Sequence, residues 1–154
     1  MTTDKTSGFN TSLAAATRQT RHRYLLDANI ISSLVRQPTG PVYQMLLQVG
    51  SEVVCTSIIV AAEIHFGLAK KRSEILSNSV ISILSNFDVL AVEAPAELHY
   101  AEIRLALARI GRPIGANDLL IAAHARSLNL TLVSNNTREF ERVPGLKLED
   151  WLAQ

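Results

Sequence analysis

Three carboxylates stand among apolar residues along the chain, and together they could hold a metal ion. Asp27 closes YLLD, a short apolar run typical of a β-strand. On a predicted helix, Glu63 has only apolar residues or glycine at the positions three and four residues away, and Asp118 repeats this pattern just before LLIAAHA. An ionised carboxylate on an apolar face must be paired, hydrogen-bonded or bound to a cation.

A fourth group of polar residues follows the later apolar run LTLV. In the segment SNNTREF, Asn136 offers a carbonyl oxygen, and Glu139 or Ser134 could contribute from the same turn. Carboxylates crowded together repel one another, so their pKa values should be raised unless a cation neutralises them. An all-oxygen ligand set suits Mg²⁺ or Mn²⁺. Such a metal activates water and stabilises a phosphoryl transition state, so these residues indicate metal-dependent phosphodiester hydrolysis.

Each carboxylate also has a simpler structural interpretation. Asp27 can cap the helix that follows it, and Asp118 can stabilise the first turn of its own helix. Glu63 can keep its carboxylate in water at the edge of an apolar face. For Asp27 the capping role is compatible with metal binding, and the sequence leaves all these interpretations open.

The histidines and the cysteine are expected to have structural roles. His65 lies two residues from Glu63 and therefore points elsewhere on a helix, while His99 and His124 are expected at the surface or at the edge of the core. Cys55, in the β-branched segment EVVCT, is expected to be a small buried hydrophobic residue.

The elements that must position the acids alternate between strands and helices. Strands are predicted at 24–27, 52–56, 87–92, 130–134 and 146–148, and helices at 28–36, 41–49, 58–72, 73–86, 95–110 and 117–128. This alternation predicts an α/β fold in which a parallel sheet is covered on both faces. Ligands of such sheets collect at the carboxyl ends of the strands, where Asp27 lies.

Composition limits the classes of protein to which the chain can belong. Its 154 residues fit one domain, and 47% hydrophobic with 19% charged residues allow a sizeable core. No uncharged apolar run approaches the roughly 18 residues of a membrane span. The single cysteine excludes an internal disulfide framework. The net charge is +1, so bulk charge alone does not predict nucleic-acid binding.

Residues 1–23 differ in composition from the rest. They are rich in Thr, Ser and Ala without sustained periodicity, and we expect a flexible N-terminal extension ahead of a domain at 24–154. They lack the longer apolar stretch of a secretory signal, so a cytoplasmic location is expected; an Arg-rich transit peptide is the lesser alternative.

Four segments resemble a known family: YLLDANIISSLVR, IIVAAEIHFGLAK, GANDLLIAAHARSL and LVSNNTREFERVPGLKLEDW are similar to the PIN-domain toxins of bacterial VapBC modules. The resemblance covers residues 24–152 with the motifs in the family's order. It implies a three-layer PIN-like fold whose central, mainly parallel sheet has four to five strands flanked by helices. It also implies the toxin of a type II toxin–antitoxin system, a Mg²⁺-dependent endoribonuclease. Members often cut structured RNAs, tRNA among them.

The resemblance also implies roles for single residues. The acidic positions of the family, which bind metal and catalyse, fall on Asp27, Glu63 and Asp118. Asn136 stands at the fourth position, where many members have Asp, and is expected to be a weaker ligand. Glu139 would then substitute for it or bind through water. Ser57 matches a position where members often have Ser or Thr near the metal, and it is also a favourable helix N-cap.

The family further implies three partners: an RNA substrate, a cognate antitoxin that inserts a segment into the active-site groove, and a second copy of the chain. In the homodimer, residues 41–49 and 57–72 are expected to carry partner surface. Basic side chains that could contact RNA phosphates, or equally be solvated surface charges, are Lys70, Lys71, Arg72, Arg112 and Arg138.

Two other functions are alternatives to this interpretation. A catalytically silent PIN-like module would bind RNA or a partner without cleavage, but retention of all three carboxylates argues against it. A phosphatase of the haloacid dehalogenase type would need an acid where Asn29 stands, and a lysine after a middle strand that the chain lacks.

Overall fold

The structure is a computed structural model that describes residues 21–153. The α/β alternation predicted from the sequence is confirmed. In chain order the elements are β1 (Tyr24–Leu26), α2 (Ala28–Arg36), α3 (Pro41–Val49), the 3₁₀ helix η1 (Ser51–Val53), β2 (Val54–Ser57), α4 (Ile58–Lys71), α5 (Glu74–Leu84), β3 (Asp88–Leu90), α6 (Ala96–Arg109), α7 (Ala116–Ser127), β4 (Thr131–Val133), α8 (Thr137–Phe140) and β5 (Lys147–Glu149).

The sheet has five strands in the order β3-β2-β1-β4-β5, and every neighbouring pair is parallel. The central strands are continuous apolar runs because both faces of a parallel sheet are covered. Leu25, Leu26, Cys55, Leu132 and Val133 are all fully buried. The five-stranded parallel sheet and the buried cysteine therefore agree with the predictions.

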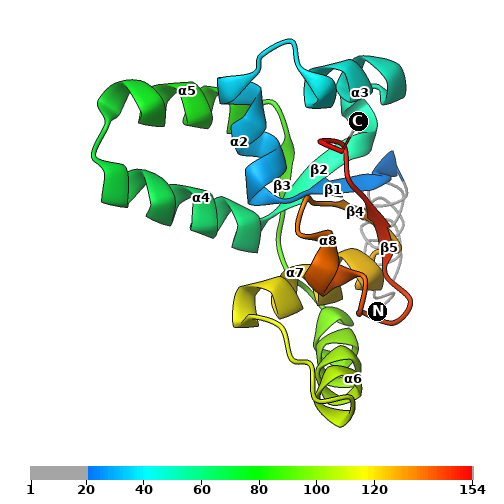
Figure 1. Ribbon diagram of the computed structural model, residues 1–154. Helices are drawn as coiled ribbons and strands as arrows, with labels where there is room; N and C mark the ends of the chain where they lie inside the picture. Colours follow the sequence, from blue (N-terminus) through cyan, green and yellow to red (C-terminus); the bar gives the residue numbers. More distant parts are fainter. Residues whose placement is uncertain (1–20, 154) are drawn as a thin grey trace, which may run out of the picture.

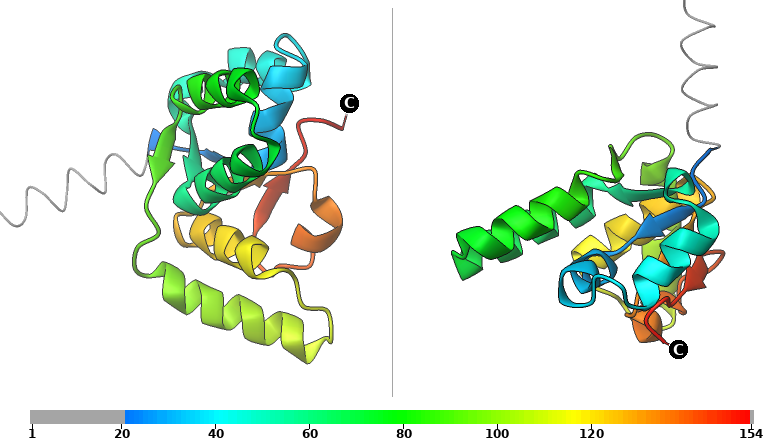
Figure 2. Two further views of the ribbon diagram at one scale, coloured as in Figure 1. Left: turned by 90° about the vertical axis from the view of Figure 1, so that its left-hand side faces the viewer. Right: turned by 90° about the horizontal axis from the view of Figure 1, so that it is seen from above.

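Helices cover the sheet on both sides, which gives three layers (Figure 1). Helices α2, α3 and α5 lie on one side of the sheet, and α6 and α7 lie on the other. Helices α4 and α5 also form an arm that projects beyond the strands, as the view from above shows (Figure 2). Residues of α4 contact both α2 and α7, so this helix lies between the two helical layers.

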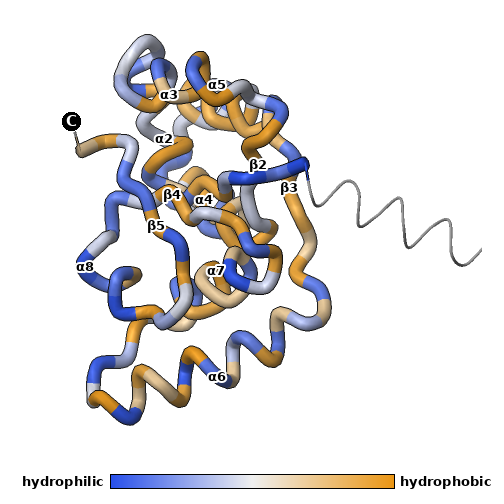
Figure 3. Tube along the Cα trace, turned by 90° about the vertical axis from the view of Figure 1, so that its right-hand side faces the viewer, coloured by the Kyte–Doolittle hydropathy of each residue, from blue (hydrophilic) through white to orange (hydrophobic). Residues whose placement is uncertain are grey.

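The strand order creates a switch point beside β1. The chain runs from β1 to β2 and β3 on one side and then returns to β4 on the other side of β1, with Leu26 opposite Val133. The carboxyl ends of β1 and β4 therefore meet at the place where parallel α/β sheets bind ligands. Asp27 follows β1 there, and the strongly hydrophilic turn into α8 follows β4 (Figure 3).

The packed structure includes residues just before the predicted start of the domain at Tyr24. Arg23 extends β1, since its N–H donates to the carbonyl of Val53 and its carbonyl accepts from Thr131. His22 is buried, and its Nε2 lies 2.8 Å from a carboxylate oxygen of Asp88. Residues 21–23 thus belong to the packed part of the chain. The flexible extension predicted for the preceding residues lies outside those described.

The boundaries of the predicted strands and helices agree with the structure to within two residues. The start of β2 is one of the places that differ by two residues, because a 3₁₀ turn at residues 51–53 precedes the strand, which continues to Ser57. Of the helices at residues 21–153, none is both long enough and apolar enough to cross a lipid bilayer.

Candidate active site

Asp27 is fixed at the switch point by two hydrogen bonds. It lies directly after β1 and is 7% exposed. One carboxylate oxygen accepts from the backbone N–H of Ala28 at 2.8 Å and caps α2. The other accepts from Ser134 Oγ at 2.7 Å, at the end of β4. The capping interpretation is correct, and it leaves the second oxygen among the polar residues that follow β4.

Glu63 projects from the second turn of α4 toward the other acids. Partial burial raises the pKa of its carboxyl group, and the nearby charge of Asp27 raises it further. A hydrogen bond from the side chain of Asn117 acts in the opposite direction, because it stabilises the ionised form. Glu63 is thus partly buried and faces Asp27 and the start of α7. The sequence did not single out Asn117, since nothing local marks it as a partner of a residue on α4.

Asp118, in the first turn of α7, is the most perturbed acid of the site. Burial, a hydrogen bond with Glu139 and the charges of Asp27, Glu139 and Glu63 together raise its pKa to about 7, and burial has the largest effect. A hydrogen bond between two carboxyl groups requires one of them to carry a proton. The raised pKa values expected for crowded carboxylates are therefore present at Glu63 and Asp118.

Asn136 lies between the acids of α7 and α8. Its side-chain Nδ2 donates to Asp118 at 3.3 Å and to Glu139 at 3.0 Å. Its backbone N–H donates to Ser134 Oγ at 3.0 Å, which holds the turn after β4 closed. The amide thus presents its donor end, not its carbonyl oxygen, to the carboxylates. Thr137 begins α8 without acting as its cap, since Asn136 holds the cap position.

The donor set fits a hard divalent cation in its chemistry. The carboxyl groups of Asp27, Glu63, Asp118 and Glu139 all offer oxygen, and Asp118, with a pKa of about 7, is about half protonated at neutral pH because burial and the neighbouring acids disfavour its ionised form. A cation can replace that proton. With the side chains as they stand, no three Asp, Glu, His or Cys groups within residues 21–153 are arranged to hold a metal ion. In their place, a shared proton and the Asn136 amide link Asp118 and Glu139.

Ser57 and His124 form a buried pair behind the acids. Ser57 is fully buried and caps α4, its Oγ accepting from the N–H of Ile59 at 3.1 Å. The same Oγ lies 2.8 Å from Nδ1 of His124, which is 1% exposed. The expectation that His124 lies at the surface or at the edge of the core is wrong, because α7 presents this residue to α4 and the sheet. His65 is exposed and His99 is half-buried.

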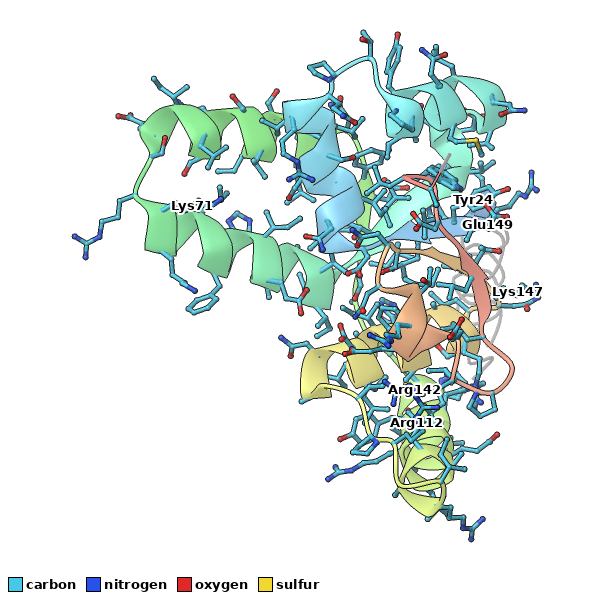
Figure 4. The ribbon with its side chains drawn as sticks, viewed as in Figure 1. Tyr24, Lys71, Arg112, Arg142, Lys147 and Glu149 are labelled. Atoms are coloured by element: carbon cyan, nitrogen blue, oxygen red, sulfur yellow. The ribbon has the colours of Figure 1, made fainter. Side chains whose placement is uncertain are left out.

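The basic residues predicted to contact RNA are divided between two regions. Lys70, Lys71 and Arg72 lie at the far end of α4, where Lys70 sits 5.2 Å above the ring of Phe66. Figure 4 shows Lys71 at the outer part of the arm, away from the carboxyl ends of the strands. Arg138 instead lies on α8 between Asn136 and Glu139 in sequence.

Arg112 lies in the loop before α7, where its carbonyl accepts from Arg142 Nη1 at 3.1 Å (Figure 4). Arg142 ties this loop to the segment after α8. The sequence did not single it out, since only the tertiary contact distinguishes it from a surface arginine.

Comparison with known proteins identifies relatives over most of the chain. Residues 24–146 match the model of the PIN domain family. The tRNA(fMet)-specific endonuclease VapC of Shigella flexneri is 41% identical over 131 residues, which cover 84% of this chain and 98% of the relative. Ribonuclease VapC2 of Rickettsia felis is 37% identical over 130 residues, which cover 83% of this chain and 97% of the relative.

Solved structures give the same similarity in three dimensions. VapBC2 of Rickettsia felis bound to a promoter DNA fragment contains a chain with a TM-score of 0.74 and 36% identity, over 83% of this chain and 98% of that one. A chain of DNA-bound VapBC from Salmonella typhimurium gives a TM-score of 0.77 and 34% identity, over 84% of this chain and 98% of that one.

Proposed function

Because the chain belongs to the PIN-domain family and, within it, to the VapC ribonucleases, we propose that it is a toxin that hydrolyses RNA at the cluster of Asp27, Glu63 and Asp118. The nearness of these acids carries the proposal: Asp27 and Glu63 lie close enough to Asp118 for their charges to raise its pKa, which is about 7. Such an arrangement is unfavourable without a cation and is typical of sites that perform chemistry.

We assign Mg²⁺, with Mn²⁺ as a substitute, to Asp27, Glu63 and Asp118, with Asn136 and Glu139 as weaker contributors. A bound cation would neutralise these acids and lower the pKa of a water molecule. Asp27 is suited to this role because hydrogen bonds from Ala28 and Ser134 fix its orientation. The proton shared by Asp118 and Glu139 must leave before both carboxylates can ligate, so low pH opposes metal binding.

The substrate class proposed is tRNA. Two of the relatives, from Shigella flexneri and Salmonella typhimurium, are named tRNA(fMet)-specific endonucleases. Arg138 and Arg112 are exposed on the segments next to Asn136 and Asp118, where they can contact phosphates on either side of a scissile bond. Lys70, Lys71 and Arg72 would reach only a substrate that extends along the α4–α5 arm. Such a substrate implies a cytoplasmic site of action.

An antitoxin is the expected protein partner, because the neighbouring structures are VapBC complexes. We propose that its inserted segment covers the acids, as the family resemblance implies. We also propose a homodimer with α3 in its interface.

Cleavage of a labelled tRNA by the purified chain tests the proposal and excludes the silent-module alternative. We expect cleavage with Mg²⁺ or Mn²⁺, none with EDTA, and at least about a hundredfold loss in Glu63→Gln. A matched control is Glu74→Gln, on the exposed first turn of α5, which should cleave normally. Cleavage that survives EDTA or the Glu63 substitution would contradict the assignment of the site.

A further inference from the structure

The buried pair of Ser57 and His124 joins the two helices that carry Glu63 and Asp118. Ser57 lies six residues before Glu63 on α4, and His124 lies six residues after Asp118 on α7. The two helices contact each other and run in opposite directions, as Figures 1 and 2 show. The polar pair therefore lies at one end of the contact and the two carboxylates at the other.

The distance along the helix from the polar residue to the acid is the same on α4 and α7. Six residues span about 9 Å of an α-helix. A shift of α7 along α4 would thus break the Ser57–His124 contact and move Asp118 away from Glu63 by the same amount. The side chain of Asn117 also bonds Glu63 between these helices, and the apolar residues that α4 and α7 bury pack without directional preference. A hydrogen bond of 2.8 Å between fully buried groups is directional, and breaking it leaves polar atoms without water.

On its Nδ1 side the pair is satisfied with a neutral imidazole. Burial lowers the pKa of His124, although the nearby backbone carbonyl of Ala91 and the charge of Glu93 oppose this effect. With Nδ1 as the acceptor, the Ser57 hydroxyl donates to it. The hydroxyl oxygen still accepts from the N–H of Ile59. Nε2 of the same ring is buried without a hydrogen-bond partner among the described residues. One serine thus caps α4 and bonds α7.

We propose that Ser57 and His124 are positioning residues that set the axial register of α4 against α7 and so bring Glu63 and Asp118 together for metal binding. This inference rests on the proposed function. It also gives Ser57 a role different from the expected one near the metal, because its hydroxyl bonds a buried histidine.

Mn²⁺ titration of the full chain by calorimetry tests the pair. In Ser57→Ala and His124→Leu we expect Mn²⁺ affinity to fall about tenfold, in the range found for groups that orient metal ligands. His124→Asn should retain most of the affinity, because its side-chain oxygen can accept from Ser57 in place of Nδ1. The double variant Ser57→Ala/His124→Leu should lose little more than either single variant, since both remove one interaction.

A matched control separates this role from helix capping. Ser73 caps α5, its Oγ accepting from the N–H of Leu76 at 3.2 Å, and it has no histidine partner among the hydrogen bonds of the described chain. Ser73→Ala should lower the free energy of unfolding by about 1 kcal/mol, as loss of a cap does, without changing Mn²⁺ affinity. A similar loss of affinity in Ser73→Ala, or full affinity in Ser57→Ala and His124→Leu, would overturn the proposal.

A measurement without metal distinguishes failure of the register proposal from failure of the proposed function. In amide NMR spectra recorded with EDTA, Ser57→Ala and His124→Leu should shift the signals of Glu63 and Asp118, whereas Ser73→Ala should leave them in place. If the wild-type chain binds no Mn²⁺, the metal assignment is wrong, and these shifts alone decide whether the pair sets the register. Unchanged signals at both acids would refute the register role whatever the metal does.

Discussion

The proton on Asp118 connects the chemistry of the site to the stability of the chain. An unfolded aspartate loses its proton near pH 4, whereas Asp118 holds it until about pH 7 in the folded chain. Between these values the folded state binds more protons than the unfolded state. The stability contributed by this group is therefore fully present below about pH 4 and is lost as the pH rises toward 7.

We predict that the metal-free chain becomes less stable between about pH 4 and pH 7 and that Asp118→Asn removes much of this dependence. Because Asp118 is only partly buried and shares its proton with Glu139, the difference between the two chains should be about 1–2 kcal/mol. Urea unfolding in EDTA at several pH values measures it. Adding Mg²⁺ at the higher pH should restore stability to the wild type but far less to the variant. Parallel pH dependence in both chains would show that Asp118 ionises normally.

At the scale of single elements, the start of α2 shows how one residue can serve fold and chemistry together. Asp27 caps this helix with one oxygen and faces Ser134 with the other. Asn is about as good an N-cap as Asp, whereas Ala removes the cap at a cost of about 1 kcal/mol. The two substitutions therefore separate the capping role from the negative charge.

We predict that Asp27→Asn abolishes RNA cleavage while its midpoint of thermal unfolding stays at or above that of the wild type. Asp27→Ala should lose cleavage and also unfold several degrees lower. Cleavage assays and calorimetry on the same preparations provide the comparison. Activity in Asp27→Asn would mean that the carboxylate is needed only as a cap.

The sequence was sufficient to predict the strands and to single out the three acids, because both have local signals. Parallel strands are unbroken apolar runs, and Glu63 and Asp118 are conspicuous on apolar helix faces. The contacts between elements have no such signal. That Asn117 bonds Glu63, that His124 is buried against Ser57 and that Asn136 turns its amide nitrogen to the acids depends on how α4, α7 and α8 are oriented. The orientation of these helices depends on tertiary packing, and local sequence patterns do not show which side chains that packing brings together.

At the scale of the whole molecule, α3 and the end of α5 form an apolar surface that no other segment of residues 21–153 covers. A cavity of about 680 Å³ lies there, lined largely by apolar side chains that include Leu34, Leu46 and Phe87. At its edge Leu47 is 63% exposed and Tyr43 is 37% exposed. Exposed apolar groups around a hollow are typical of protein interfaces. Helix α3 is one of the two segments expected from the sequence to carry partner surface, so we propose it for the homodimer.

We predict that the chain is a dimer at micromolar concentration, with twice the monomer mass of 16.9 kDa in light scattering. Leu47→Glu should give a monomer, because a carboxylate buried in an apolar interface without a partner is strongly unfavourable. Leu98→Glu is the matched control: Leu98 is 66% exposed on α6, in the opposite layer, and this variant should remain a dimer. Circular dichroism and thermal unfolding check that both variants fold. A monomeric wild type, or a dimer that persists in Leu47→Glu, would place the partner surface elsewhere. Loss of the dimer in Leu98→Glu alone would assign it to α6.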